Sequence, residues 1–419
     1  MNRTQTALKI RDQIERFSGI FSPHFSKPQS RFIADMLFGI QASQDTRLSE
    51  ISRALDEPIE TKKTEERLCR HLAVEGMDQR INEQIAKHAS RRVHRDTLIV
   101  VDPTDIRKRY ARRMPYLARI RDGSTGQPAD GYWGCVALAC EPGKRRAIPL
   151  HQRLWSSKAP DFISENEQLL QIISTIAIAT NKRGIYVIDR GGDRNKLYNP
   201  LLDMNLRFLI RLVGTRHLVY RGRKRLARTL AENCPMSYAD SVLKEHHGQQ
   251  KRYRIEYGMR PVKLPGRKAQ LYLVVIKGFG AEPIMLLTNV EVKKTRKGLW
   301  DILEAYTARW MVEEIIRFIK QSYRLENMRL LHYQRLRNMT ALVLAAAYFS
   351  ARWMGGSLKL QVLCSHATSI SRRLLGVPDF HYYALADGIA RLLSRIPRIP
   401  HRSTNRPKDS PQLLLPIAT

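Results

Sequence analysis

Two short apolar runs, each followed at once by an aspartate, constrain the fold of this chain more than any other feature. Residues 97–101 read TLIVV before Asp102, and residues 184–188 read GIYVI before Asp189. Runs of this length that are apolar on both faces are typical of strands in a sheet covered on both sides. Open α/β sheets usually bind their ligands at the carboxyl ends of such strands, so we expect both aspartates at a binding edge.

The segments around these two runs alternate between strand-like and helical patterns. Apolar, β-branched stretches predict further strands, and amphipathic stretches predict helices. The expected strands are residues 131–140, 147–155 and 207–212, and the expected helices are residues 165–177 and a long one at 299–320. This alternation predicts an α/β protein built on a mixed sheet.

Changes of composition along the chain predict five segments. Two parts of one α/β core are expected to be separated by a basic, β-rich insertion, with a helical domain before them and a helical region with a basic, Pro-rich tail after them. These segments are residues 1–94 (helical domain), 95–212 (first part of the core), 213–298 (insertion), 299–360 (second part of the core) and 361–419 (C-terminal region and tail).

The charge of the chain indicates its kind of partner. Its 72 Lys and Arg against 39 Asp and Glu give a formal net charge of +33. An excess of this size repels itself in a compact protein, so we expect a polyanion as partner, with nucleic acid the first candidate. The excess is marked in the insertion, where residues 205–268 hold 16 Lys or Arg against 4 acidic residues.

The N-terminal segment has a pattern that fits a helix, a turn and a second helix. Leu48, Ile51 and Leu55 stand at helical spacing, residues 56–60 (DEPIE) signal a turn, and Thr64 resembles the cap of a new helix. In a basic protein such a pair could place one helix in a DNA groove. An ordinary helical hairpin explains the same pattern, and only the overall charge favours the DNA-binding interpretation.

Cysteine usage and the apolar runs bear on location. The five cysteines are scattered without a C-x-x-C pair, which argues against a disulfide scaffold and a zinc cluster. The first residues lack the apolar stretch of a secretory signal. The longest apolar run, residues 341–349, is shorter than the roughly 18 residues that span a bilayer, and predicts a buried helix. We expect a cytoplasmic protein without membrane association.

The expected helix at 299–320 gathers charged residues on one stripe. With Tyr306 at zero and about 100° per residue, Arg309 falls near ~300°, Glu313 near ~340°, Arg317 near ~20° and Lys320 near ~320°. A solvated face stabilised by i, i+4 ion pairs explains the stripe equally well. The apolar residues fall on the opposite side of the helix: Met311, Val312, Ile315, Ile316, Phe318 and Ile319.

Three carboxylates in this pattern match the needs of a divalent cation. Asp102, Asp189 and Glu313 are hard oxygen ligands of the kind that Mg²⁺ requires. Two such ions could activate a water or a 3′ hydroxyl and stabilise the leaving oxygen of a phosphodiester. Asp105 is an alternative first ligand, but Asp102 directly ends the apolar run; Asp193 is an alternative second ligand, but its position suits a loop or a helix cap.

Four residues of the stripe also carry a family resemblance. Tyr306, Arg309, Glu313 and Lys320 fit the spacing Y-(2)-R-(3)-E-(6)-K without a mismatch. This signature is similar to that of DDE transposases of insertion-sequence family four, which have a ribonuclease H-like catalytic core. VVDPT (100–104) resembles the family's first aspartate motif and VIDRGGD (187–193) its second, and the position of the β-rich insertion and of LLTNV (286–290) also fits.

The resemblance, which covers roughly residues 95–350, implies a function. A transposase of this kind binds the terminal inverted repeats of its insertion sequence and performs metal-dependent DNA cleavage and strand transfer by a cut-and-paste route. Asp102, Asp189 and Glu313 would hold two Mg²⁺ ions, which Mn²⁺ can replace, and Tyr306, Arg309 and Lys320, joined by Arg317 on the same stripe, would contact DNA phosphates. The partners would be double-stranded DNA of the element's ends and of the target, and a second copy in a synaptic homodimer, in the nucleoid of a prokaryotic cell.

One departure and several rival functions remain open. Some relatives stack a flipped base on a tryptophan of the insertion, but residues 205–298 contain no Trp. Tyr220, Tyr253, Tyr257 and Phe279 could substitute, although each fits a core or strand position. The rivals are a non-catalytic DNA-binding regulator derived from a transposase, a ribonuclease H-like metal-dependent nuclease, and a basic structural protein.

Overall fold

The fold is described from a computed structural model of the chain. The described residues are 2–109, 111–141, 147–246, 249–354, 363–365, 367–368, 382–396 and 398. Most of the predicted segment 361–419, including nearly all of its basic tail, lies outside these residues.

The N-terminal segment is helical, as predicted. Its helices are α1 (Arg3–Ser18), α2 (Lys27–Ser43), α3 (Leu48–Leu55), α4 (Thr61–His71) and α5 (Met77–Ser90). The predicted cap at Thr64 is wrong, because α4 begins at Thr61. The hydroxyl of Thr64 donates instead to a carboxylate oxygen of Glu57 at 2.8 Å, so it fixes the loop before the helix.

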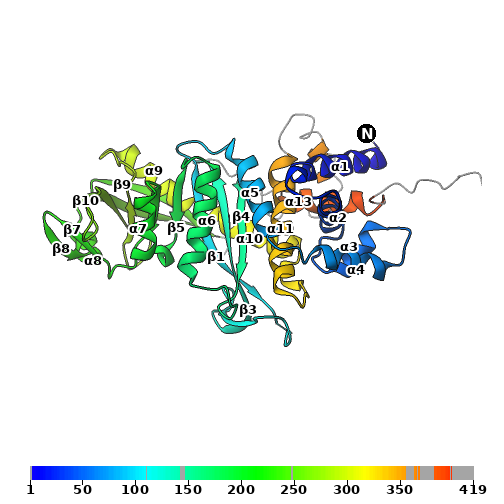
Figure 1. The fold of residues 1–419 in the computed structure, drawn as a ribbon. Helices are drawn as coiled ribbons and strands as arrows, with labels where there is room; N and C mark the ends of the chain where they lie inside the picture. The colour runs from blue at the N-terminus through cyan, green and yellow to red at the C-terminus, as the bar shows by residue number, and fades with distance from the viewer. Residues whose placement is uncertain are drawn as a thin grey trace, which may run out of the picture.

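A mixed sheet forms the centre of the molecule (Figure 1). Within the described residues, ten strands join in the order β2-β3-β1-β5-β6-β12-β11-β10-β9, with β4 paired to β3. The first six strands are β1 (Leu98–Arg107), β2 (Ala118–Arg121), β3 (Pro128–Cys140), β4 (Ala147–Trp155), β5 (Ile185–Ile188) and β6 (Arg207–Arg211). The predicted strands at 131–140, 147–155 and 207–212 are therefore confirmed, and with them the mixed α/β class.

Strand β1 is longer than its apolar run. The run pairs in parallel with β5, and this pairing ends at Val101 opposite Ile188. The strand nevertheless continues to Arg107, because its polar second half pairs antiparallel with β3. Asp102 thus lies inside β1, where the parallel pairing ends, and the prediction that it ends the strand is wrong.

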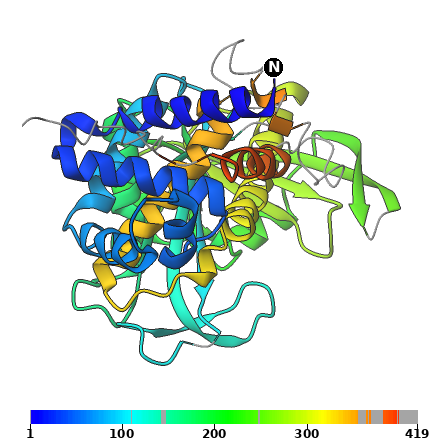
Figure 2. The same ribbon diagram turned by 90° about the vertical axis from the view of Figure 1, so that its right-hand side faces the viewer.

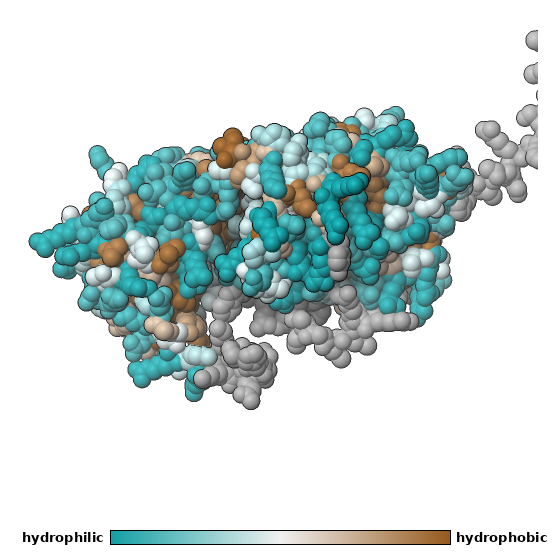
Figure 3. Space-filling view, turned by 90° about the horizontal axis from the view of Figure 1, so that it is seen from below, coloured by the Kyte–Doolittle hydropathy of each residue, from teal (hydrophilic) through white to brown (hydrophobic). Residues whose placement is uncertain are grey.

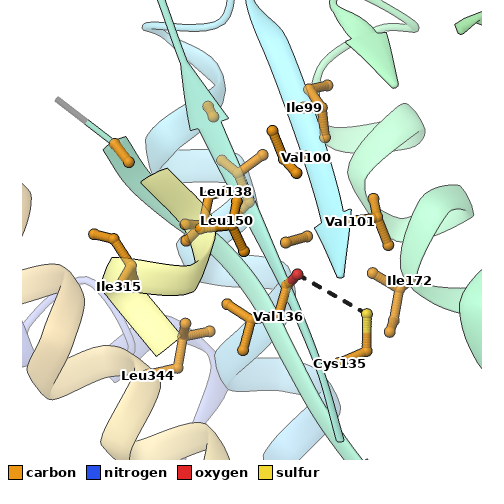
Figure 4. Packing of buried hydrophobic residues seen from close by; sticks show 14 of the residues in the cluster. Ile99, Val100, Val101, Cys135, Val136, Leu138, Leu150, Ile172, Ile315 and Leu344 are labelled. Atoms are coloured by element: carbon orange, nitrogen blue, oxygen red, sulfur yellow. Dashed lines mark hydrogen bonds between the residues drawn. The ribbon is translucent and has the colours of Figure 1, made fainter. Parts of the chain in front are cut away.

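Apolar side chains fill both faces of the sheet (Figure 4). Val101 and Cys135 point toward Ile172 of α6 (Glu165–Ala179) on one side. On the other side, Leu138 and its neighbours on β3 and β4 face the helices α10 (Trp310–Ser322) and α11 (Tyr333–Tyr348). The expectation of a sheet covered on both sides is confirmed, and the covering explains why β1 and β5 are apolar throughout.

The strands of residues 213–298 extend the sheet beyond β6. They are β7 (His217–Tyr220), β8 (Arg223–Leu226), β9 (Tyr238–His246), β10 (Gln249–Val262), β11 (Leu271–Lys277) and β12 (Ile284–Thr288), with the short helix α8 (Ala227–Glu232). β12 pairs antiparallel with β6, and β11, β10 and β9 follow outward, whereas β7 and β8 form a separate two-stranded sheet. This segment is rich in strands, as predicted.

The long helix expected at 299–320 is two helices. α9 (Arg296–Thr307) and α10 are separated by a turn at Ala308 and Arg309. Here the backbone N–H of Arg309 bonds the carbonyl of Tyr306 at 3.1 Å, an i−3 bond that tightens the chain locally. Angles counted from Tyr306 as in one helix therefore do not hold across this turn.

The N-terminal helices dock on the helices that follow the sheet (Figure 2). α11 is almost wholly buried, which confirms the prediction of a buried helix around 341–349. Asn338 of α11 donates to the carbonyls of Leu72 and Val74 at 2.9 and 2.7 Å and accepts from the backbone N–H of Asp78. The described residues also form α7 (Asn195–Asp203), α13 (Tyr382–Leu393) and the π-helical turn Phe349–Trp353. No helix among the described residues is long and apolar enough to cross a membrane.

Candidate active site

Asp102 and Asp189 stand side by side at one edge of the parallel strands. Val101 of β1 pairs with Ile188 of β5, so the next residue of each strand is an aspartate at the same level of the sheet. Asp189 begins a short 3₁₀ turn, where its carboxylate accepts the backbone N–H of Gly191 at 2.8 Å. The two apolar runs therefore bring together two carboxylates that are 87 positions apart in the sequence.

Arg309 links the strand aspartate to the helix glutamate. Its guanidinium lies 3.6 Å from Oδ2 of Asp102 and donates to Oε1 of Glu313 at 3.0 Å. Asp102 and Arg309 are largely buried, whereas Glu313 is half exposed. Nε of Arg309 is buried and has no hydrogen-bond acceptor within the described residues.

The charges of the site act on one another. Burial raises the pKa of Asp102 to about 7; Arg309 opposes this shift, and the carboxylates of Asp189 and Glu313 add to it. Conversely, burial works against the charge of Arg309, but the carboxylates of Asp102, Glu313 and Asp189 contribute to a raised pKa of its guanidinium. The three carboxylates thus form one electrostatic cluster around a single arginine.

A cavity of about 340 Å³ opens beside this cluster. Strand β1, the end of β2 and the turn after it, strand β3 and helix α10 all contribute to its walls. The lining residues are Asp102, Pro103, Thr104, Asp105, Arg121, Gly123, Trp133, Glu313 and Ile316. A cavity with three carboxylates and an arginine can hold a charged ligand or ion against the sheet edge.

Lys320 lies in the same neighbourhood, three turns after Arg309. Its ammonium donates to Oδ1 of Asp105 at 3.2 Å and stands 3.6 Å from a carboxylate oxygen of Glu326. Asp105, the alternative first ligand, therefore lies in the cavity with Asp102 and is engaged by Lys320. Of the two aspartates, Asp102 is the one that lies beside Asp189, because Val101 pairs with Ile188.

The other two residues of the predicted stripe occupy different surroundings. Tyr306 is 5% exposed, in α9 before the turn, and its backbone carbonyl accepts the backbone N–H of Arg309 at 3.1 Å. Arg317 is exposed and donates to Glu314 at 2.7 Å, on the face of α10 next to the stripe. The structure therefore brings Arg309, Glu313 and Lys320 to the strand aspartates, while Arg317 is engaged by Glu314.

Asp193, the alternative second ligand, has a structural role. Its carboxylate pairs with Arg216 and accepts the backbone N–H of Val213 at 2.8 Å. The side chain is 3% exposed. These contacts anchor the loop after β6, so the carboxylate of Asp193 is engaged there and not in the cavity. Its position in a loop agrees with the prediction from the sequence.

The aromatic residues considered for the insertion have packing partners. Tyr257 is buried and donates to Asp240 at 2.5 Å, and the guanidinium of Arg260 lies 4.8 Å from the ring centre of Tyr220. Sequence reasoning missed Trp133 and Arg121, which line the cavity. In the sequence, only the position of Arg121 and Trp133 on either side of a turn that follows Asp102 could have indicated that they lie near the cavity.

The carboxylates fit a divalent cation in their chemistry. Asp102, Asp189 and Glu313 offer hard oxygens, and burial raises the pKa of Asp102 to about 7, a shift that a bound cation would oppose. Within the described ranges, however, no three His, Cys, Asp or Glu side chains are grouped closely enough to hold a metal ion as they stand. In this arrangement the guanidinium of Arg309 lies between Asp102 and Glu313.

Comparisons with known proteins bear on this site. Among solved structures, the piggyBac transposase in a synaptic complex with hairpin DNA is similar at 12% identity and a TM-score of 0.43, over 95% of this chain and 86% of that chain. A search of curated proteins gives no match. The family model described as the transposase DDE domain matches residues 94–349, which hold the whole cluster and more than half of the chain. The chain therefore belongs to the family of transposase DDE domains.

Proposed function

We propose that this protein is a DNA transposase that cuts DNA at the terminal inverted repeats of its own element and joins the ends to target DNA. Family membership supports a transposase. The observation that carries the proposal is the cluster of Asp102, Asp189 and Glu313 at one edge of the sheet, beside an open cavity.

The carboxylates would hold two Mg²⁺ ions, or Mn²⁺ in their place. DDE transposases generally use divalent metal ions, which supply Lewis-acid stabilisation of the phosphate and of the attacking oxygen. Asp102 and Asp189 are fixed by neighbouring strands, and Glu313 is on the facing helix. Arg309, which now neutralises two of them, would have to share or release those carboxylates.

The cations of α10 would hold the DNA backbone. The buried Nε–H of Arg309 has no acceptor among the described residues, and a phosphate oxygen would satisfy it. Lys320 reaches the cavity side at Asp105. Tyr306 would add a phosphate contact from the end of α9, and Arg317 would offer an exposed charge to the phosphates. Tyr306, Arg309, Glu313 and Lys320 would then correspond to the Y-R-E-K signature of insertion-sequence family four, with Arg317 as a neighbouring cation.

The rest of the chain would select and pair the DNA ends. Helices α3 and α4 fit a reader of the repeat sequence, as a helix pair in a strongly basic chain. Two copies would pair two ends in a homodimer, in the nucleoid of a prokaryotic cell. The segments 1–94, 95–212, 213–298, 299–360 and 361–419 would then correspond to the DNA reader, the two core parts around the insertion, and the tail.

A cleavage assay with neutral isosteres tests this proposal. Asp102→Asn, Asp189→Asn and Glu313→Gln should each abolish cleavage of a repeat-bearing duplex in Mg²⁺ and leave DNA binding intact. Glu314→Gln, one position along the same helix and paired with Arg317, is the matched control and should cut normally. Normal cutting by any of the first three removes that residue from the triad.

Two further readouts separate the rival functions. Joining of the cut ends to a target plasmid distinguishes a transposase from a nuclease with the same fold. Binding without any cleavage by the wild type would leave a DNA-binding regulator as the function.

A further inference from the structure

A second basic surface lies beside the cavity, on the hairpin that follows Asp105. We call residues 107–109 and 111–130 the basic hairpin; it joins the end of β1 through β2 to the start of β3. Residues 107–130 of the sequence hold seven Lys or Arg against two Asp. In Figure 1 this part of the chain projects below the sheet, and the face seen from that side in Figure 3 is mostly hydrophilic.

Most of these cations are not used inside the protein. Arg107 pairs with Asp122, and Arg119 with Asp130. Lys108 is buried and donates to the carbonyls of Glu326 and Met328. The remaining four form no ion pair with any described residue, and their side chains are exposed: Arg109, Arg112, Arg113 and Arg121. Four exposed, unneutralised arginines on one short hairpin repel one another, so they point to an anionic partner.

Hydrogen bonds hold two parts of the basic hairpin in place. The carboxylate of Asp122 accepts the backbone N–H of Ser124 at 2.8 Å, and Ser124 hydrogen bonds hold the pKa of Asp122 well below its usual range. The hydroxyl of Tyr132 donates to the carbonyl of Pro115 at 2.6 Å. A preformed surface binds without the cost of ordering a loop.

The hairpin forms one wall of the catalytic cavity. Arg121 and Gly123 line it opposite Glu313 and Ile316 of α10. Gly123 approaches Asp105 so closely that a Cβ there would lie 3.0 Å from the Asp105 carboxylate oxygen. A DNA strand with its scissile phosphate in the cavity therefore has the cations of α10 on one side and those of the hairpin on the other.

We propose that the basic hairpin binds the phosphate backbone of the DNA that flanks the element, on the far side of the scissile phosphate from the inverted repeat. This inference rests on the proposed function, in which the α10 cations hold the element's own end. Flanking DNA has no fixed sequence. Exposed arginines that reach phosphates, and no base-reading helix, suit such a partner.

Two labelled duplexes test the proposal by fluorescence anisotropy. One is the inverted repeat that borders the gene, blunt at its outer end, and the other continues beyond the repeat by about 10 arbitrary base pairs, one helical turn. The wild type should bind the flanked duplex about tenfold more tightly, since each phosphate contact adds counterion release. Arg112→Ala/Arg113→Ala should lose most of this gain and keep the affinity for the blunt duplex.

Matched variants keep the result interpretable. Arg91→Ala/Arg92→Ala removes another exposed pair, ahead of the opposite end of β1, and should keep the full ratio of flanked to blunt affinity even if it weakens binding of both duplexes. Arg112→Lys/Arg113→Lys, which preserves charge, should keep most of it. The slope of log affinity against log salt should fall in magnitude by about 2 for the Ala variant, on the flanked duplex alone.

Three outcomes overturn the inference: no gain from the flank in the wild type, a full gain in the Arg112→Ala/Arg113→Ala variant, or an equal loss in the Arg91→Ala/Arg92→Ala control. A scrambled repeat in the same series tests the proposed function separately. Equal affinity for the scrambled and native repeats contradicts end recognition, whatever the hairpin variants do.

Discussion

Arg309 places its guanidinium 3.6 Å from the carboxylate of Asp102. Burial raises the pKa of Asp102, and Arg309 is the cation that opposes this shift. The contact joins the turn before α10 to the strand that carries the first aspartate. It therefore favours the ionised form of Asp102 and links β1 to the helix that carries Glu313.

Replacing Arg309 should shift the pH dependence of cleavage. Without the guanidinium, the pKa of Asp102 should rise further above its ordinary value, so a higher pH is needed to ionise it. In Arg309→Gln the acid limb of the pH–rate profile should move to higher pH, with a smaller move in Arg309→Lys. An unchanged acid limb in Arg309→Gln would show that Asp102 does not limit the rate.

Neutralising Asp102 should stabilise the folded protein at alkaline pH in the presence of EDTA. The pKa of Asp102 is about 7 in the folded state and near 3.9 when unfolded, so folding favours the protonated form. Protonated Asp102 therefore stabilises the fold in full below about pH 4, and this stabilisation is lost as pH rises through about 7. At pH 8 the free energy of unfolding of Asp102→Asn should therefore exceed that of the wild type, by a few kcal/mol at most (~1.4 per pKa unit).

With a divalent cation present, the wild type should become more stable than Asp102→Asn. Mn²⁺ should raise the Tm of the wild type by binding the native carboxylates, and should leave Asp102→Asn nearly unchanged. Glu314→Gln, which keeps the cluster, should respond as the wild type does. An equal rise of Tm in Asp102→Asn would place the ion elsewhere.

Lys108 should make the stability of the fold depend on pH in the sense opposite to Asp102. Its ammonium donates to the carbonyls of Glu326 and Met328 at 2.8 and 3.1 Å, and burial lowers its pKa to about 7. Because the folded value lies below the unfolded one, its contribution to stability is present above about pH 10 and is lost as pH falls through about 7.

A methionine at this position should remove that dependence. Lys108→Met keeps most of the volume but leaves both carbonyls without a donor, at a cost of about 1–3 kcal/mol each at most. Urea unfolding between pH 7 and 10 should show a lower stability and a flatter pH curve than in the wild type. An equally steep curve in Lys108→Met would assign the titration to another group.

Asn338 should be decisive for the docking of the N-terminal helices. Its side chain is fully buried and bonds the carbonyls of Leu72 and Val74 and the backbone N–H of Asp78. Asn338→Ala leaves these groups buried without partners, so unfolding should become easier by about 2–4 kcal/mol. Denaturant titration measures this, and a loss below about 0.5 kcal/mol would contradict the role of this network.

The sequence was sufficient for the features that depend on local periodicity. The runs before Asp102 and Asp189 are apolar on both faces because both faces of the sheet are covered, and their parallel register then aligns the two aspartates. The buried helix around 341–349 was equally readable, since its apolar residues leave no polar face to expose.

Features that depend on distant partners were not readable from local patterns. The second half of β1, residues 102–107, contains Pro103 and two aspartates, and is a strand only because β3 pairs with it. Ala308 and Arg309 are good helix formers, so nothing local marks the turn between α9 and α10. Trp133 reaches the cavity through the register of β3.

Anomalous diffraction from crystals soaked in Mn²⁺ tests the central claim most directly. If Asp102, Asp189 and Glu313 form the catalytic cluster, anomalous peaks should appear in contact with oxygens of all three side chains, with Arg309 moved or shared. Occupied Mn²⁺ peaks elsewhere and none at these carboxylates would contradict the account.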